Sequence, residues 1–582
     1  MVTSVRLLPM GERAVLVEVR SLDEVLALHA ALGASRPSGV VDLVPAARTV
    51  LVRVDPRVLP LVAARAWIEQ TSQATDAVAP ARTDLAAVVL DVVYDGPDLE
   101  ETAALLGLSP AGLADQHAAA EWTVAFSGFA PGFAYLVSPD WPHDVPRLDS
   151  PRTRVPAGAV GLAAGFTGAY PRETPGGWRL IATTPAVLFD PDAASPALLV
   201  PGARVVFRPS PPRPPSQARS PSQARSPSEA RSPSPPRSPN EARSPSEARS
   251  PSEARSPSEV RSPSLSRGRT GAHDEHEHDV AKTSATERGG DPRRPGIHIV
   301  EPGLLATIQD LGRPGAASLG VAASGALDRG ALRTANRLVG NPETAAGIEV
   351  TMGGFRAVAG DDLWFAVAGA WGPVLLDGHE VDPYAAHAWA RGTELHLDWF
   401  AHGARAYLAV RGGIDGRTVL DSRAADLMAG LGPAPLRAGD VVGVRDEASG
   451  PIPAASIAPW SAPHDHELVV ELAAGPRADW FAASALATLY EAVWTVSNDA
   501  DRIGVRLDGP VLQRTHEGEL PSEGMVAGAL QVPPTGRPTI LLADGPVTGG
   551  YPVIAVATDA ALDAIAQARP GTRIRFRHAR PH

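Results

Sequence analysis

The chain has 582 residues, a formal net charge of −12 and no cysteine, and 44% of its residues are hydrophobic. This length is too great for one hydrophobic core, and the hydrophobic content suffices for several globular domains. The lack of cysteine excludes disulfides, thiolate metal sites and cysteine nucleophiles. No apolar run reaches about 18 residues and the start has no signal-peptide pattern, so we expect a cytoplasmic protein without a membrane partner.

The sequence contains a single lysine, Lys282. A Walker-type phosphate loop, a Schiff-base lysine and a biotin-accepting lysine are therefore excluded from the rest of the chain. Any bound phosphate must be held by arginine, by backbone N–H groups or by a metal ion. The acidic balance also argues against a nucleic-acid partner.

The first 85 residues alternate between strand-like and helix-like runs. We predict strands at 14–19 and 48–54 and amphipathic helices at 22–32 and 59–72. This order over a short length is typical of a small α+β layer. A further strand is predicted at 88–94.

Two helices are predicted between residues 95 and 122, broken at Gly107, with Ser109 as N-cap and Pro110 at the first position of the second helix. Such a pair is also typical of a helix-turn-helix, but the second helix has neither lysine nor arginine, so a scaffold role is favoured. His117 and Glu121 lie four residues apart on this helix, and His117 is a candidate catalytic residue against the alternative of a packed histidine.

The stretch 121–184 is dense in glycine, with aromatic residues and prolines beside it. Glycine is costly to order, so this density indicates sharp turns or a close approach to a ligand. Two interpretations stay open, a barrel with glycine-rich corners and a ligand pocket. The aromatic residues that would form the walls of that pocket are Phe126, Phe129, Phe133, Tyr170 and Trp178.

Residues 209–294 have low complexity, with an arginine at every sixth position from Arg213 to Arg267. The segment has almost nothing apolar to bury, so we expect a disordered linker that spans about 50 Å. The HDEHEHD cluster at 273–279 is interpreted as a solvated charge run, because no rigid frame would present its side chains to a metal. We predict no metal site on the chain.

The second half is again rich in strands and turns, with one clear helix at 328–339 and a shorter one near 479–492. The runs VPGARVVF, PLRAGDVVGV and ARPGTRIRF resemble one another and favour three related barrel modules. The expected fold class is α+β and mostly β. The predicted domains are 1–85, 86–208, the linker 209–294, 295–445 and 446–582.

Two sets of motifs resemble a known family. HAAAEWTVAFSGFAPGFAYL and RVPAGAVGLAAGFTGAYPRETPGGW are similar to the B-type subunit of prokaryotic ATP-dependent 5-oxoprolinase, also called allophanate hydrolase subunit 1. PGLLATIQDLGRPG, SGALDRGALRTANRLVGNPE and QVPPTGRPTILLADGPVTGGYPVIA are similar to the C-type subunit, also called allophanate hydrolase subunit 2. Together they cover nearly all of the chain except the linker, so the chain resembles a natural fusion of the two subunits.

This resemblance implies a ferredoxin-like N-terminal layer and cyclophilin-like β-barrels in both halves. It also implies that 5-oxo-L-proline is opened to L-glutamate with hydrolysis of ATP, supplied with Mg, together with a separate A-type subunit of the LamB/YcsF type. The two halves would associate with each other, and a higher oligomer is compatible with this. Two alternatives remain: the carboxyltransferase part of a urea carboxylase-like biotin enzyme, whose biotin would be on another chain, and a regulator of a sensor histidine kinase.

The predicted site residues lie in these motifs or in the C-terminal part of the second half. The candidate catalytic residues are His117, Glu173 and Asp328. The candidate substrate- or ATP-binding residues are Arg154, Tyr170, Trp178, Arg313, Ser324, Asn336, Arg502, Glu523, Asp544 and Tyr551, with Asp501 beside them. Arg154 is favoured for an anion because the folded parts lack lysine, and the N-terminus of the 328–339 helix for a phosphate or carboxylate.

Overall fold

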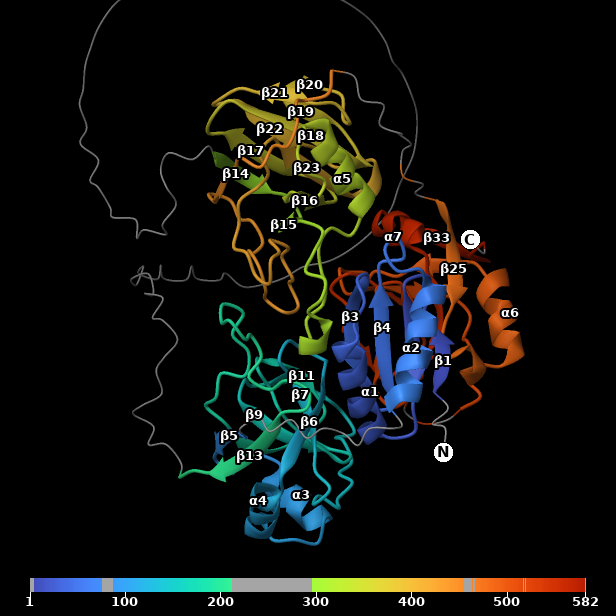
Figure 1. The fold of residues 1–582 in the computed structure, drawn as a ribbon. Helices are drawn as coiled ribbons and strands as arrows, with labels where there is room; N and C mark the ends of the chain where they lie inside the picture. The colour runs from blue at the N-terminus through green and yellow to red at the C-terminus, as the bar shows by residue number, and fades with distance from the viewer. Residues whose placement is uncertain are drawn as a thin grey trace, which may run out of the picture. The chain divides into compact units, whose positions relative to one another are not determined.

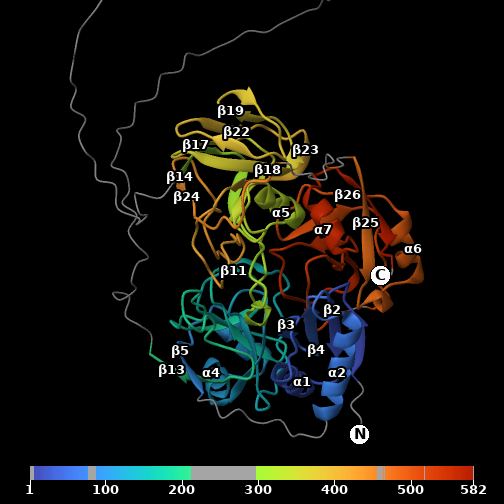
Figure 2. The ribbon, with the colours of Figure 1, turned by 45° about the horizontal axis from the view of Figure 1, so that its top comes forward.

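The N-terminal layer is a four-stranded antiparallel sheet covered on one face by two helices (Figure 2). The computed structural model describes residues 5–75, 87–211, 296–454, 463, 466–516, 518 and 520–580, so nearly all of the predicted linker, with the 273–279 cluster, lies outside the described residues. The sheet order is β1-β2-β4-β3. The elements are β1 (Arg6–Pro9), β2 (Ala14–Glu18), α1 (Leu22–Ala34), β3 (Val40–Pro45), β4 (Thr49–Val54) and α2 (Leu61–Thr75).

Both faces of this sheet are buried, which explains why its strands are apolar at successive positions. Val15 and Val17 of β2 face the core beneath α1 and α2. Leu16 faces the other way and belongs to a cluster with Met525 and Leu541 from the C-terminal part of the chain. The alternation of side chains along a strand therefore gives the sheet one internal core and one apolar interface.

The second module is a seven-stranded sheet in the order β12-β9-β10-β7-β6-β13-β5, with a two-stranded sheet of β11 and β8 (Figure 1). Ser109 caps the second of its two helices and Pro110 occupies the first position, as the sequence predicts. The elements are β5 (Val88–Val92), α3 (Leu99–Leu105), α4 (Pro110–Ala119), β6 (Trp122–Ser127), β7 (Ala134–Val137), β8 (Arg152–Val155), β9 (Ala159–Ala163), β10 (Phe166–Ala169), β11 (Thr174–Gly176), β12 (Arg179–Thr183) and β13 (Arg204–Pro209).

The third module packs a six-stranded sheet and a five-stranded sheet around one core. Helix α5 contacts β18 and β23 of the five-stranded sheet (Figure 1). The elements are β14 (Gly296–Pro302), β15 (Leu305–Gln309), the 3₁₀ helix η2 (Ala317–Leu319), α5 (Arg329–Leu338), β16 (Gly347–Thr351), β17 (Phe355–Ala359), β18 (Leu363–Trp371), β19 (Val374–Leu376), β20 (His379–Glu380), β21 (His387–Trp389), β22 (Glu394–Leu397), β23 (His402–Val410) and β24 (Val441–Gly443).

The last module is a closed barrel in the order β25-β32-β29-β30-β27-β26-β33. Residues of α6 and α7 also belong to its hydrophobic core. The elements are β25 (Glu467–Ala474), η3 (Ala478–Trp480), α6 (Ala483–Glu491), β26 (Trp494–Val496), β27 (Gly504–Asp508), β28 (Glu523–Gly524), β29 (Ala529–Gln531), β30 (Thr539–Leu541), β31 (Thr548–Gly549), β32 (Val553–Ala557), α7 (Asp559–Ala566) and β33 (Arg573–His578).

The described residues are thus mostly β, as the sequence predicts, and contain seven α-helices. The helix predicted at 328–339 is α5, with Asp328 as its N-cap, and the helix near 479–492 is η3 followed by α6. The described residues of 1–212 and 290–582 form one compact unit. Within the described residues, no helix is long and apolar enough to cross a bilayer.

Candidate functional site

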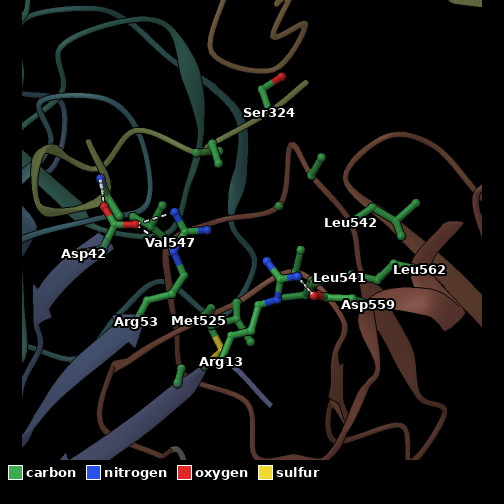
Figure 3. Close-up of a pocket in the computed structure, with 18 of the residues that line it drawn as sticks. Arg13, Asp42, Arg53, Ser324, Met525, Leu541, Leu542, Val547, Asp559 and Leu562 are labelled. Atoms are coloured by element: carbon green, nitrogen blue, oxygen red, sulfur yellow. Dashed lines mark hydrogen bonds and ion pairs between the residues drawn. The ribbon is translucent and has the colours of Figure 1, made fainter. Parts of the chain in front are cut away.

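A cavity of about 200 Å³ lies where three separate stretches of the chain meet (Figure 3). The N-terminal layer contributes one wall through Arg13 and Arg53, and the last barrel contributes another through residues 541–543 and 545–547. The third wall is the segment from Val321 into the first turns of α5. The two sequence halves therefore build this cavity together.

Two arginines of the N-terminal layer enter the cavity, each beside a carboxylate (Figure 3). Arg53 Nε donates to Asp42 Oδ2 at 2.8 Å, and Asp42 Oδ1 in turn accepts from the Ala317 backbone N–H at 3.2 Å. Arg13 forms an ion pair with Asp559, the first residue of α7. These contacts hold both guanidinium groups at the cavity wall.

Helix α5 adds two more arginines to the same wall, Arg329 and Arg333. Burial lowers the pKa of Arg329, and the neighbouring charges of Arg53, Arg333 and Arg13 lower it further. The Arg329 guanidinium donates to the carbonyl oxygen of Leu311 at 2.6 Å. Four guanidinium groups thus converge among four carboxylates of the same lining, and the repulsion between the arginines favours the binding of an anion between them.

The N-terminus of α5 is already occupied by carboxylates of the chain itself. Asp328 Oδ1 accepts from the Ala331 N–H at 2.8 Å, and Asp563 Oδ1 accepts from the Arg329 N–H at 3.0 Å. These are the groups that would bind a phosphate at a helix N-terminus. The arrangement argues against the phosphate or carboxylate site predicted at this helix end, and the arginines nearby take its place.

Asp328 is buried, and its second oxygen accepts from Gln567 Nε2 at 2.7 Å. Burial, with a contribution from Asp563, raises the pKa of Asp328 to about 7. The carboxyl is therefore close to half protonated at neutral pH. Asp328 itself is not among the residues that line the cavity, so its position supports capping rather than contact with a reactant.

Behind the cavity lies a chain of buried hydrogen bonds that joins the third module to the last barrel. Ser324 Oγ donates to Asp544 Oδ1 at 2.6 Å, and Arg502 Nε donates to Asp544 Oδ2 at 2.8 Å. Arg502 Nη1 continues to Glu349 Oε1 at 2.6 Å, and Tyr407 donates to Glu349 Oε2 at 2.7 Å. Burial would lower the pKa of Arg502, but Glu349 and Asp544 together raise it above its usual value.

Ser324 has a φ of 53°, which is unusual for a residue other than glycine. Its hydroxyl points away from the arginines of the cavity (Figure 3) and toward Asp544. The network fixes this strained turn, and Arg502 also binds the Gly325 carbonyl at 2.7 Å. Ser324, Asp544 and Arg502, all predicted as site residues, are therefore brought together.

Arg313 lines the cavity and is buried, and its guanidinium donates to the carbonyl oxygens of Val419 and Ala424. Burial lowers its pKa, while Asp426 opposes this. Its Nη1 has no hydrogen-bond partner among the described residues. Arg313 is thus a further cation at the cavity wall.

Four other predicted residues of the second half lie elsewhere. Asn336 is buried and donates to the Ala345 carbonyl at 2.8 Å, a packing role inside α5. Glu523 is paired with Arg477 and Asp501 accepts from the turn backbone at Ile503, while Tyr551 is exposed. None of these side chains lines the cavity.

The predicted residues of the first half also lie away from the cavity. His117 is fully buried among aromatic rings, with Nδ1 2.8 Å from the Tyr94 hydroxyl and Nε2 2.9 Å from Thr167 Oγ1. Burial lowers the pKa of His117 to about 3. Its location argues against the predicted catalytic role. Arg154 and Glu173 form an exposed ion pair of 2.7 Å on the surface.

The aromatic residues of the glycine-rich stretch mainly pack against one another. Tyr170 and Trp178 are buried and belong with Phe133 to one hydrophobic cluster. This arrangement agrees with the core interpretation for these rings, not with an open pocket. Phe129, at a φ of 65°, is the exception, because it lines a second and smaller cavity.

Sequence reasoning missed Arg13, Arg53, Arg329 and Arg333, the four arginines that converge on the cavity. One signal was present for Arg53, because a charged residue in the otherwise apolar run TVLVRV needs a partner when the strand is buried. Arg13 gave no such signal, since its position depends on α7, more than 500 residues later. Among the described residues, no group of three or more His, Asp or Glu side chains is placed to hold a metal ion.

Comparison with known proteins agrees with this division. A model of the carboxyltransferase domain, subdomains C and D, matches residues 5–199, and one for subdomains A and B matches residues 319–578. A repeat of unknown function matches 239–264. The two halves of the chain thus match the two parts of a carboxyltransferase domain.

Each of the following relatives matches one of the two halves of the chain. The chain is 35% identical to the C-type subunit of 5-oxoprolinase from Escherichia coli K12 over 284 residues, which is 48% of this chain and 90% of that one. It is 48% identical to the B-type subunit of 5-oxoprolinase from E. coli O157:H7 over 126 residues, 21% of this chain and 57% of that one. Urea amidolyase of Lachancea kluyveri is 32% identical over 306 residues, 48% of this chain and 17% of that one.

A crystal structure of a protein designated TTHA0988 resembles the whole chain. The TM-score is 0.75 at 33% identity, with 97% of this chain and 99% of that one covered. The chain therefore belongs to the carboxyltransferase-domain family that includes the C-type subunit of 5-oxoprolinase, and it carries a B-like and a C-like half in one polypeptide.

Proposed function

We propose that the chain is the B–C component of an ATP-dependent 5-oxoprolinase, with the arginine-lined cavity as the site for the terminal phosphates of ATP. The observation that carries this proposal is the convergence of Arg13, Arg53, Arg329 and Arg333 on one cavity built by both halves. The names of the relatives of each half support the reaction.

The size and charge of the cavity fit this role. A cavity of about 150 Å³ holds benzene, so about 200 Å³ is room for one or two phosphate groups but not for a whole nucleotide. Arginine binds phosphate through paired N–H donors, and it is the cation available in a chain whose single lysine is Lys282. The Mg would enter bound to the phosphates of ATP.

The chemistry explains why ATP is needed. A five-membered lactam is resonance-stabilised and re-forms readily, so water alone opens it poorly. If the amide oxygen attacks the γ-phosphorus, ADP leaves and an imidate-like phosphate ester forms. Water adds to its carbon, the C–N bond breaks as the nitrogen takes a proton, and a second water releases phosphate from the resulting acyl phosphate. Guanidinium groups at the transferred phosphate would stabilise the charge that develops there.

Further parts of the proposal rest on the resemblance. A separate A-type subunit of the LamB/YcsF type would complete the enzyme, which would act in the cytoplasm. The N-terminal layer would be ferredoxin-like and the modules with larger sheets cyclophilin-like. Biotin would not be attached to this chain.

A carboxyltransferase role is the second candidate, favoured by the match to urea amidolyase over 48% of this chain. It would place a carboxylated biotin from another chain, not ATP, in the cavity. The two candidates differ in their products, because only the first releases glutamate and ADP from 5-oxoproline.

The test mixes the purified chain with a purified LamB/YcsF-type protein, 5-oxo-L-proline and MgATP, and measures glutamate and ADP. The proposal expects equal amounts of both products, formed only in the mixture. The proposal would be contradicted if the mixture formed no glutamate and instead carboxylated urea when a biotin carrier and a biotin carboxylase were added.

A further inference from the structure

A second, smaller cavity lies on the other side of one wall of the arginine-lined cavity. Ala322 and the segment 545–547 line both cavities. The far wall comes from the glycine-rich stretch of the B-like half, through Phe129, Pro131, Arg172 and Thr174. The C-like half supplies Asp426, Asp544 and the apolar side chain of Met428.

Two polar atoms from the B-like half are buried here with no hydrogen-bond partner among the described residues. They are Arg172 Nη1 and Thr174 Oγ1, both on residues that line the cavity. A buried donor without a partner is unfavourable, so such atoms need an explanation. Two unpartnered donors at one small cavity point to an acceptor group that a ligand would bring.

The opposite wall carries a pair of buried carboxyl groups. Asp544 is paired with Arg502, whose Nε lies 2.8 Å from its Oδ2. Asp426 accepts from the Ala429 N–H at 2.8 Å and has no such bidentate arginine. Burial and the charge of Asp544 raise the pKa of Asp426 to about 6, while Arg313 and Arg502 oppose this. Asp426 therefore takes up a proton more readily than an exposed aspartate does, and the protonated carboxyl can donate a hydrogen bond.

The space itself is small, about 30 Å³, which is about the share of one water molecule in the liquid. It admits a group of the size of a carboxylate, not a complete ring. Phe129, Pro131 and Met428 provide an apolar surface for what is attached to that group. The cavity thus fits the charged end of a small, otherwise weakly polar molecule.

We propose that this second cavity binds the carboxylate of a small cyclic amino acid through Arg172 and Thr174, with Asp426 on the opposite wall. The ring then lies at the open side of this cavity, against Phe129, Pro131 and Met428 and beside the wall shared with the arginine-lined cavity. This deepens the proposed function, on which it rests, because it places the lactam and the phosphates of ATP on two sides of one wall. Arg172, not the exposed Arg154, is then the anion contact of the B-like half.

The carboxyl group of Asp426 gives the site a defined pH dependence. The groups that face it are Asp544, Arg313 and Arg502, with Arg172 on the cavity wall. A bound carboxylate raises the pKa of Asp426 further, so binding takes up a proton above pH 6. Affinity is then greatest below about pH 6 and falls up to tenfold for each pH unit above it.

The experiment measures binding of 5-oxo-L-proline to the full chain by isothermal titration calorimetry, with pyrrolidin-2-one, which lacks the carboxylate, as comparison ligand. We expect the comparison ligand to bind at least tenfold more weakly. Arg172→Met should weaken binding of 5-oxo-L-proline at least tenfold and Thr174→Val a few-fold. Asp426→Asn should remove the pH dependence between pH 6 and 8. The matched control is Arg204→Met, an exposed arginine of the same module that pairs with Glu121, and it should bind as the wild type does.

Several outcomes would overturn the inference: no binding to the wild type, equal binding of the two ligands, wild-type affinity in folded Arg172→Met and Thr174→Val, or an unchanged pH profile in Asp426→Asn. Failure of the proposed function gives a different pattern. Suppose that the mixture with the LamB/YcsF-type protein made no glutamate but binding of 5-oxo-L-proline still required Arg172. The inference about the second cavity would then stand, and the proposed function would fail. If glutamate formed with an unaltered KM for 5-oxoproline in Arg172→Met, the inference would fail and the proposed function would remain.

Discussion

Arg502 of the last barrel donates a 2.6 Å hydrogen bond to Glu349 of β16, 153 positions earlier in the chain, and both side chains are almost fully buried. The pair joins the third module to the last one. Arg502 also binds Asp544, so one guanidinium serves two buried carboxylates. Removing it would leave both charges without their principal partner in a low-dielectric interior.

We therefore predict that Arg502→Met lowers the free energy of unfolding by about 3–5 kcal/mol. Urea denaturation followed by tryptophan fluorescence measures this. The control is Arg537→Met, which removes an exposed ion pair with Asp508 and should cost at most about 1 kcal/mol. Equal stability of the two variants would show that the buried network is not what joins the modules.

The second prediction concerns association of the halves. A side chain at Gly128 would meet Thr548 of the C-like half, since an added Cβ would lie 1.8 Å from its Oγ1. Co-expressed segments 1–211 and 290–582 should copurify, and Gly128→Val should abolish this. Gly165→Ala is the control, because nothing lies within 4 Å of a Cβ at that glycine.

Copurification of the Gly128→Val halves at wild-type yield would mean that this contact does not hold the halves together.

We expect the linker only to tether the two halves, so it should not be needed for their copurification. Shortening its repeats should therefore leave glutamate formation unchanged, and loss of activity would show that it does more.

The third prediction is a pH dependence of stability from Asp328. Its folded pKa of about 7 lies above the usual value of 3.8, so between these values the folded state binds more protons than the unfolded state. Stability from this group is therefore highest at low pH and is lost as the pH rises through about 7. Asp328→Ser keeps an N-cap but does not titrate, so the thermal midpoint of this variant should fall less than that of the wild type from pH 5 to 8. Parallel profiles would contradict the assignment.

The helices and strands can be predicted from the sequence better than the residues of the site can. The capped helices α4 and α5 and the apolar strands of the N-terminal layer follow from local signals such as Ser109, Pro110 and Asp328. The members of the network of Ser324, Asp544 and Arg502 are predicted only as separate candidates, because nothing local relates residues 220 positions apart.

The cavity arginines show the physical limit of such prediction. Arg13 and Arg333 look like ordinary surface residues until the fold places the N-terminal layer and α5 at the same cavity. Conversely, His117 and Trp178 have the chemistry of site residues, but burial without a cavity makes them part of a core. Whether a side chain faces a cavity or a core depends on long-range packing that periodicity does not record.

The most direct test of the account compares two arginines of helix α5. Arg333 lines the cavity and Arg337 does not, yet both lie near the same carboxylate, Glu343, at 3.9 and 3.8 Å. The KM for ATP is measured in the glutamate-forming mixture for Arg333→Met and Arg337→Met. The account predicts at least a tenfold rise for Arg333→Met, because a guanidinium that meets phosphate is lost, and a wild-type value for Arg337→Met. An equal KM for both variants and the wild type would contradict the assignment of the cavity to the phosphates of ATP.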